Sequence, residues 1–291
     1  MVLMLLAILF SSVLTLLFKL FSKWRVHTFQ AIVINYFVAV SCGVIFSGEL
    51  PFSFDVSSPK AILALGIGSL FIFGFNVLAR TVQVHGITVG TLMQKMSVLL
   101  TVLYALFYFN ETIGMNKGIG IALAVISIGL VTIKDPVSLL NKERSLDARL
   151  MLLPVLTFVS SGIIDSLFLT GQKMHWVVGT DIVFISSLFF TAGVLGVMSW
   201  ISYPKYRHIP ERRTIMAGVL LGIPNFLSVY FLLKILDLGW DGSIIFPIFN
   251  VGVLLASAIM GWLIMREEMP VKRALGVIMA AISIYLISTS I

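Results

Sequence analysis

The sequence predicts an all-α integral membrane protein, with ten transmembrane helices arranged as two inverted five-helix repeats around a central cavity. Composition, the spacing of apolar runs and an internal repeat lead to this prediction. Hydrophobic residues make up 59% of the 291 residues and charged residues only 11%, and the mean hydropathy is +1.06. Soluble domains are about half apolar, so this composition excludes a water-soluble globule.

Ten apolar runs, bounded by charged residues, Gly and Pro, have the length of a membrane-spanning helix, for which about 20 residues suffice. They cover residues 1–21, 29–47, 61–82, 87–109, 115–133, 150–171, 180–201, 214–236, 242–264 and 271–290. The first run lacks a preceding basic residue and a following cleavage site, so we expect it to persist as a helix. The short connections leave no room for a soluble catalytic domain.

Basic residues gather in alternate connections. The connections after odd-numbered helices hold fifteen Lys and Arg residues, and those after even-numbered helices hold four. Because Lys and Arg accumulate on the cytoplasmic side, the sequence predicts that the odd connections are cytoplasmic and that both termini face outward. The net charge of +7 therefore reports orientation rather than nucleic-acid binding. The single cysteine, Cys42, excludes an internal disulfide and a multi-cysteine metal site.

Motifs of the first half recur 156 positions later in the second half. The matching positions are Asn110-Glu111, Lys117, Gly120 and Ile126-Ser127-Ile128, followed by Arg266-Glu267, Arg273, Gly276 and Ile282-Ser283-Ile284. An odd number of spans in each copy inverts the second copy, as in many secondary transporters. The predicted organisation is a first five-helix repeat (1–134), a cytoplasmic linker (135–149) and an inverted second repeat (150–291).

The ends of these repeats carry a family resemblance. The fourth predicted helix runs through residues 90–97 (GTLMQKMS) and ends at Phe109-Asn110-Glu111, and the second copy runs from residues 246–250 (FPIFN) to Arg266-Glu267-Glu268. With ten spans in two fives, the chain resembles the EamA branch of the drug/metabolite transporter superfamily. The resemblance implies a secondary carrier with a central cavity that works by alternating access. One departure is an acidic connection after the second helix, where many members have a basic one.

Polar side chains collect on one face of several predicted helices. Lipid cannot satisfy such groups, so each polar face should contact other helices or a wet cavity. The candidate substrate-binding residues chosen from these faces are Lys95, Gln94, Thr91, Asn76, Asn225, Asn250 and Ser161. For individual Ser, Thr and Gly residues, close helix packing is the alternative role. The spacings Gly86-x3-Gly90, Gly114-x3-Gly118 and Gly218-x3-Gly222 fit such packing.

Lys95 and Asp165 are charged residues well inside predicted spans. Burying an ammonium group in a membrane costs at least about 2.5 to 3.5 kcal/mol. We therefore expect Lys95 either to form a structural ion pair or to have a role in substrate binding or coupling. Asp165 could pair with Lys95, bind an amine or carry a proton, and it is the candidate for proton coupling. At 1.5 Å per residue the two residues differ in depth by about 10 Å, so direct pairing requires tilted helices.

A lysine in the cavity favours a substrate with a carboxylate or phosphate, while the amide side chains supply neutral hydrogen bonds. We therefore expect a secondary active transporter of a small polar organic metabolite, similar to an amino acid or organic anion, that couples to protons or exchanges solutes. Pro224 and Pro247 could interrupt their helices near mid-membrane to bind a solute or to bend during gating.

Two alternatives are a multipass membrane enzyme acting on a lipid or peptide, and a non-transporting scaffold. An enzyme needs a catalytic constellation, and the sequence has neither a Gly-x-Ser-x-Gly nor a His-Glu-x-x-His motif. The predicted protein is therefore not an enzyme and needs no cofactor or metal. Its expected partners are a small-molecule substrate and the lipid bilayer, without nucleic acid. A monomer is sufficient and a dimer possible, and the expected location is the inner (plasma) membrane of a bacterium.

Overall fold

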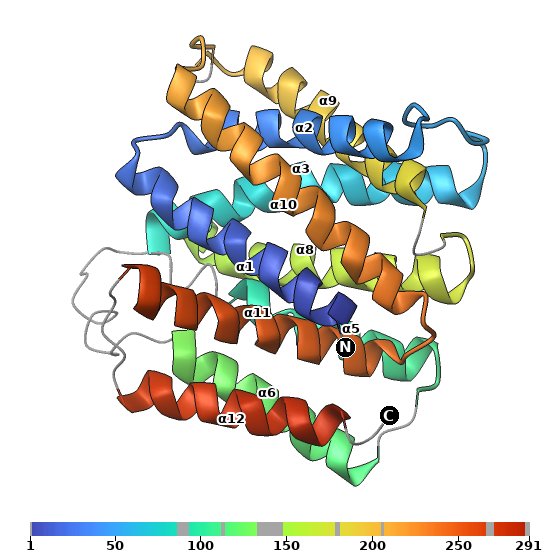
Figure 1. The fold of residues 1–291 in the computed structure, drawn as a ribbon, viewed down its shortest axis with the longest axis vertical. Coiled ribbons are helices and arrows are strands. Elements are labelled where there is room, and N and C mark those ends of the chain that lie inside the picture. Colours follow the sequence, from blue (N-terminus) through green and yellow to red (C-terminus); the bar gives the residue numbers. More distant parts are fainter. Residues whose placement is uncertain are drawn as a thin grey trace. The chain divides into compact units, whose positions relative to one another are not determined.

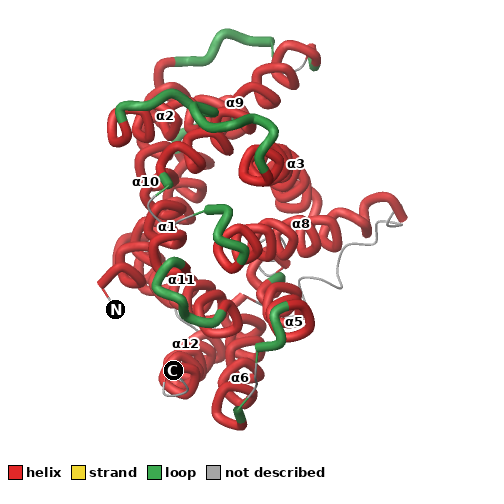
Figure 2. Tube along the Cα trace, turned by 90° about the vertical axis from the view of Figure 1, so that its right-hand side faces the viewer, coloured by secondary structure: helices red, strands yellow, loops and turns green. Residues whose placement is uncertain are grey.

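A computed structural model describes residues 2–85, 93–111, 114–132, 148–177, 181–204, 207–265 and 271–288. In this part of the chain helices are joined by short connections and no strand occurs (Figures 1 and 2). The helices are α1 (Val2–Lys23), α2 (Thr28–Ser47), α3 (Pro59–His85), α5 (Val98–Tyr108), α6 (Met115–Thr132), α8 (Ala148–Lys173), α9 (Ile182–Ser202), α10 (Arg212–Leu236), α11 (Gly242–Met265) and α12 (Val271–Ser288). Thr91, the turn at 266–268 and all but the last two residues of the predicted linker lie outside the described residues.

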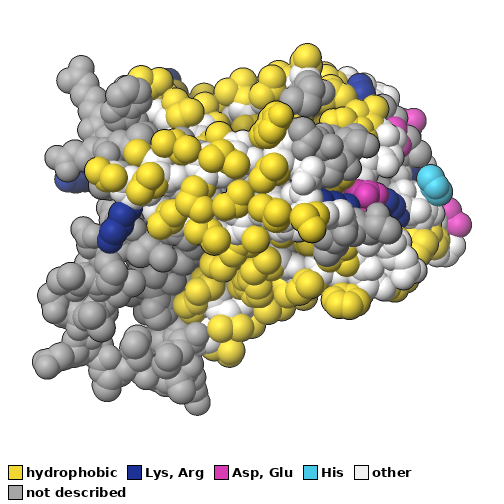
Figure 3. Space-filling view, turned by 90° about the horizontal axis from the view of Figure 1, so that it is seen from below, with side chains coloured by type: hydrophobic (Ala, Val, Ile, Leu, Met, Phe, Trp, Pro, Cys, Tyr) yellow, Lys and Arg dark blue, Asp and Glu magenta, His cyan; other side chains and the backbone are white. Residues whose placement is uncertain are grey.

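Five helical segments are long and apolar enough to cross a membrane, which confirms that the composition is that of a membrane protein. They are Thr28–Ser47, Pro59–Leu78, Leu152–Lys173, Ile182–Ser202 and Arg212–Leu236. Shorter apolar helices cover Val2–Phe18, Met93–Tyr108, Met115–Ser127, Ile244–Ala256 and Ala274–Ser283. Hydrophobic side chains dominate the middle of the face in Figure 3, and acidic side chains and a histidine lie toward one end of it.

The helices begin and end within a few residues of the predicted apolar runs, except in the fourth run. There the chain forms a helical turn at residues 93–96, followed by a turn at Ser97 from which α5 starts at Val98. Ser97 is buried, and its hydroxyl donates to the carbonyl of Gln94 at 2.6 Å. Ser97 keeps right-handed helical backbone angles, with φ -57° and ψ -19°, so the interruption at this turn is slight.

Packing divides the chain into two compact units, and each unit draws on both halves of the sequence. Unit 1 contains residues 1–72 and 167–239, and unit 2 contains residues 73–166 and 240–291. The divisions fall inside α3 and α8, so both helices run from one unit into the other. The way the chain packs into two units does not test whether its two halves arose by duplication. The two sequence repeats therefore remain a prediction.

In unit 1, α2 packs against α9 and α10, and α1 packs against α10 (Figure 1). Glycines set the close approach of α2 and α10. A Cβ atom on Gly218 would lie 2.7 Å from Ile34 Cβ, and one on Gly222 would lie 2.5 Å from Val38 Cβ. The close packing predicted for the Gly218-x3-Gly222 spacing is therefore confirmed. Among the described residues nothing lies within 4 Å of a Cβ atom on Gly114, so the same prediction is wrong at that position, and Gly86 and Gly90 lie outside the described residues.

In unit 2, α12 packs along α6, and α11 contacts α5, α6 and α12 (Figures 1 and 2). The Ser283 hydroxyl donates to the carbonyl of Gly120 at 2.7 Å and so joins α12 to α6. Its predicted repeat counterpart, Ser127, donates instead to Ala124 in its own helix at 2.7 Å. Both serines are fully buried, so each needs such an acceptor.

The expectation that prolines interrupt two helices is wrong. Helix α10 continues through Pro224 and α11 continues through Pro247. Each proline removes one backbone N–H from the ladder and crowds the carbonyl four residues earlier, but packed neighbours allow a helix to continue through that defect.

Candidate functional site

The site is built around Lys95, in the helical turn that precedes Ser97. Lys95 is partly exposed, and its Nζ donates to the Oδ1 of Asn250 on α11 at 3.4 Å. The helical turn of residues 93–96 ends directly after Met96, at the turn formed by Ser97. Lys95 therefore lies in the last turn of this short helix.

Asn250 is the buried centre of the site, with 5% of its surface exposed. Its Nδ2 donates to the carbonyl of Phe246, one turn earlier in α11, at 3.1 Å. Asp165 on α8 also interacts with this amide. An amide offers one carbonyl and two N–H hydrogens, and here the oxygen accepts from Lys95 and the nitrogen donates to Phe246.

Asp165 completes a triad with Lys95 and Asn250 inside unit 2. The opposite charges of Lys95 and Asp165 attract each other. Lys95 and Asp165 both interact with Asn250, so residues 93–96, α8 and α11 all contribute to this site. An ammonium and a carboxylate joined through an amide form a group of zero net charge, which is the state that a low-dielectric interior tolerates best.

The triad can bind a solute in two ways. A carboxylate of the solute can replace the amide oxygen at Lys95, and an ammonium or a proton can neutralise Asp165. Lys95 and Asp165 are partly exposed, whereas Asn250 is buried.

The remaining predicted binding residues fall in different places. Asn76, Gln94 and Ser161 belong to unit 2 with the triad and are partly exposed. Asn225 belongs to unit 1, where its Nδ2 donates to the Oδ1 of Asn35 at 2.9 Å. That bond joins α10 to α2 inside the core of unit 1, so in this structure Asn225 has a structural partner.

The sequence interpretation missed two polar pairs. The first is Asn35 with Asn225. Asn35 is 1% exposed, and its position in the middle of an apolar run was a sequence signal for a buried polar group. The other is the ion pair of Lys117 at the start of α6 with Asp241 just before α11, with Nζ and Oδ2 3.1 Å apart. Lys117 is 3% exposed, yet its place beside a predicted helix end gave no sign of burial.

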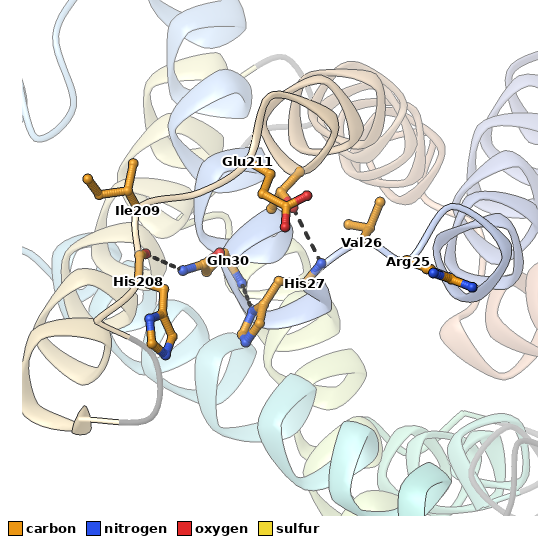
Figure 4. A pocket seen from close by; sticks show the side chains of 8 residues that line it. Arg25, Val26, His27, Gln30, His208, Ile209 and Glu211 are labelled. Atoms are coloured by element: carbon orange, nitrogen blue, oxygen red, sulfur yellow. Dashed lines mark hydrogen bonds between the residues drawn. The ribbon is translucent and has the colours of Figure 1, made fainter.

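A separate hollow of about 450 Å³ lies in unit 1, between the α1–α2 and α9–α10 connections (Figure 4). The residues lining it are Arg25, Val26, His27, Gln30, His208, Ile209, Glu211 and Thr214. Hydrogen bonds tie its walls together: Gln30 Nε2 donates to the carbonyl of His208 at 2.7 Å, and the backbone N–H of His27 donates to the Thr214 hydroxyl at 3.4 Å. No residue predicted to bind substrate lines it.

A search of the described ranges finds no group of three or more His, Cys, Asp or Glu side chains that could hold a metal ion.

Comparison with known proteins supports the fold and leaves the activity open. No family model matches the chain. An uncharacterized protein of Haemophilus influenzae is 25% identical over 285 residues, which cover 96% of this chain and 94% of the relative. A protein of known crystal structure superposes with a TM-score of 0.77 at 14% identity, covering 99% of this chain and 96% of the other. The all-helical architecture is therefore shared along the whole chain.

Proposed function

We propose that this protein is a secondary active transporter of a small polar metabolite that carries a carboxylate. In this proposal ten helices in two inverted repeats, of the EamA type, span the inner membrane of a bacterium and move the solute by alternating access. The observation that carries it is the triad of Lys95, Asn250 and Asp165 within one compact unit. The relative in Haemophilus influenzae, matched along nearly its whole length, agrees with a bacterial origin.

The proposed role of Lys95 is to bind the substrate carboxylate. The Lys95 ammonium group has a neutral amide as its hydrogen-bond partner, and a carboxylate acceptor would add the attraction between opposite charges to the hydrogen bond. A substrate carboxylate therefore gains by displacing the amide oxygen of Asn250. Asn76, Gln94 and Ser161 are the proposed neutral hydrogen-bonding groups.

The proposed role of Asp165 is to keep the site neutral. A monovalent anion at Lys95 would leave the Asp165 carboxylate without a counter-charge, and a proton on Asp165 restores zero net charge. A zwitterion restores it with its own ammonium group. No observation specifically favours the membrane-enzyme alternative.

Thermal melting of the detergent-purified protein against amino acids, organic acids, sugars, amines and phosphorylated metabolites tests the proposal. A ligand that binds the folded state raises the melting temperature by mass action. We expect a carboxylate-bearing compound to stabilise the wild type, and Lys95→Met to abolish that shift. The matched control Lys234→Met removes a lysine whose Nζ donates to Tyr230 near the end of α10, and it should keep the shift.

Flux into proteoliposomes then separates transport from binding alone. Uptake of the stabilising compound by wild type, and its loss in Lys95→Met, is the expected outcome. Binding without any uptake or exchange would contradict the transporter proposal, and a shift that survives Lys95→Met would contradict the role of Lys95.

A further inference from the structure

Helices α8 and α5 approach each other closely at Gly162, inside unit 2 (Figure 2). A Cβ atom on Gly162 would lie 2.7 Å from Cδ1 and 2.8 Å from Cβ of Leu100. The Cδ1 atom could move aside by a rotation of the side chain, but the Cβ atom is bonded directly to the backbone of α5. Because carbon atoms in contact are usually about 3.5 to 4.0 Å apart, only glycine at position 162 lets the two helices come this close.

Gly162 lies in the part of α8 that carries the acidic group of the candidate site. Asp165 follows it by three residues, which is a rise of about 4.5 Å along the helix. The Gly162 carbonyl also accepts a hydrogen bond from the hydroxyl of Ser166, the residue next to Asp165, at 2.7 Å. The approach of α8 to α5 at Gly162 therefore helps to set where Asp165 stands.

Leu100 is linked to Lys95 through the turn at Ser97. The backbone N–H of Leu100 donates to the Ser97 carbonyl at 2.9 Å, and the Ser97 hydroxyl donates to the carbonyl of Gln94 at 2.6 Å. Ser97 is 1% exposed, so the surrounding side chains also hold this turn in place. A displacement of Leu100 should therefore be passed on to the segment that carries Lys95.

The side-chain contacts of the site are too loose to fix its geometry by themselves. The hydrogen bond from Lys95 Nζ to Asn250 is 3.4 Å long, beyond the usual range of about 2.7 to 3.2 Å. A binding site needs its groups held to within about 0.5 Å. The helices that carry Lys95 and Asp165 must therefore supply this precision.

We propose that the contact between Gly162 and Leu100 sets the position of Lys95 relative to Asp165, which makes Gly162 and Leu100 positioning residues of the candidate site. A methyl group at position 162 would push α5 and α8 apart by about 1 Å, which is more than the site tolerates. The inference rests on the proposed function, since it concerns the same site, and it assigns a role in that site to two residues outside the triad.

The coupling between Lys95 and Asp165, measured without substrate, tests this proposal. A double-mutant cycle with Lys95→Met and Asp165→Leu is measured by chemical denaturation of the full-length protein, in wild type and in Gly162→Ala. We expect Gly162→Ala to lose most of the coupling, because a bond from Lys95 to Asn250 that is already long does not span a further separation of about 1 Å. A packing residue without a positioning role would lower the stability of all four proteins equally, and an unchanged coupling would overturn the proposal.

Gly74→Ala is the matched control. Gly74 belongs to α3 in the same unit and faces the same helix, and a Cβ atom there would lie 3.4 Å from the Ser160 Oγ atom on α8, an ordinary contact. This variant should keep the wild-type coupling.

The exchange variant Gly162→Ala/Leu100→Gly removes the overlapping carbon atoms from α5. It should fold even if Gly162→Ala alone does not, and it should recover the coupling. An exchange variant that stays as unstable as Gly162→Ala, or that folds without the coupling, would overturn the contact as the cause.

Melting shifts with ligand separate this inference from the proposed function. For a carboxylate compound that stabilises the wild type, Gly162→Ala should need at least about tenfold more compound for the same shift, whereas Gly74→Ala should respond like wild type. Equal affinity of Gly162→Ala and wild type would overturn the positioning role. If no compound stabilises the wild type, the proposed function fails, and the coupling measurement alone decides the role of Gly162.

Discussion

Lys95 and Asp165 show how single residues inside a membrane protein depend on one another. Each carries a charge that lipid would not tolerate alone, and both interact with the amide of Asn250. Removing one charge of such a pair is costly because the other stays behind, whereas removing both can be nearly neutral.

A double-mutant cycle measures this coupling. We expect Lys95→Met and Asp165→Leu each to lower the free energy of unfolding, and the double variant to recover part of the loss. The interaction energy should fall between about 0.5 and 3 kcal/mol. Chemical denaturation of the three variants and wild type gives the value, and strict additivity would show that the two charges act independently.

Asp165→Asn tests proton coupling separately from binding. The amide keeps the size and hydrogen-bonding capacity of the carboxyl group but cannot take up a proton at physiological pH. If Asp165 carries the coupled proton, the variant should still exchange substrate across proteoliposomes but lose accumulation driven by a pH gradient. Accumulation by the variant at the wild-type level would assign proton coupling to another group, or to none.

At the scale of helices, glycine determines how closely α2 and α10 approach. A Cβ atom at Gly222 would meet the Val38 side chain at 2.5 Å and the backbone oxygen of Asn35 at 2.9 Å. Because a backbone atom cannot move aside as a flexible side chain can, the helices themselves must separate. The bond between Asn35 and Asn225 lies along the same two helices and depends on their spacing.

Gly222→Ala should therefore destabilise the protein by about 1 to 3 kcal/mol, the usual cost of overpacking. The matched control is Gly66→Ala, in α3 of the same unit, where a Cβ atom would meet nothing within 4 Å. That variant should be neutral or slightly stabilising, because alanine favours a helix by about 1 kcal/mol over glycine. Melting curves in detergent compare the two, and an equal response to both substitutions would refute the packing argument.

At the scale of the whole molecule, membrane topology follows from the ends of α2. Its 20 residues span about 30 Å at 1.5 Å per residue, the thickness of the hydrocarbon core. Gln30 near its start bonds to the connection that contains His208, and the connection after its end contains Val56. These two connections should therefore lie on opposite sides of the membrane.

Cysteine labelling in cells tests this arrangement. In a Cys42→Ala background, a cysteine at Val56 should react with a membrane-impermeant maleimide from outside, whereas one at His208 should react only after the cells are opened. Both positions are exposed. The expected sides follow from the distribution of Lys and Arg, and the reverse labelling pattern would invert the orientation without changing the fold.

The sequence by itself determined which segments are helical and apolar, because hydropathy and helix-ending residues act over a few positions. It also marked Lys95, Asp165 and the Gly218-x3-Gly222 spacing as unusual, because a charge or a small-residue pattern inside an apolar run can be recognised locally. The turn at Ser97 and the continuous helices at Pro224 and Pro247 went against local expectation, since packing decides whether a weakened helix breaks or continues.

Only the tertiary structure decided which polar residues become partners. The contact of Lys95 with Asn250 joins positions 155 residues apart, and the contact of Asn35 with Asn225 joins positions 190 residues apart. Helical periodicity gives the face on which a side chain stands, but it does not give the tilt of the helix or the neighbour that meets that face. For the same reason the sequence could not show that Lys95 and Asp165 both interact with Asn250.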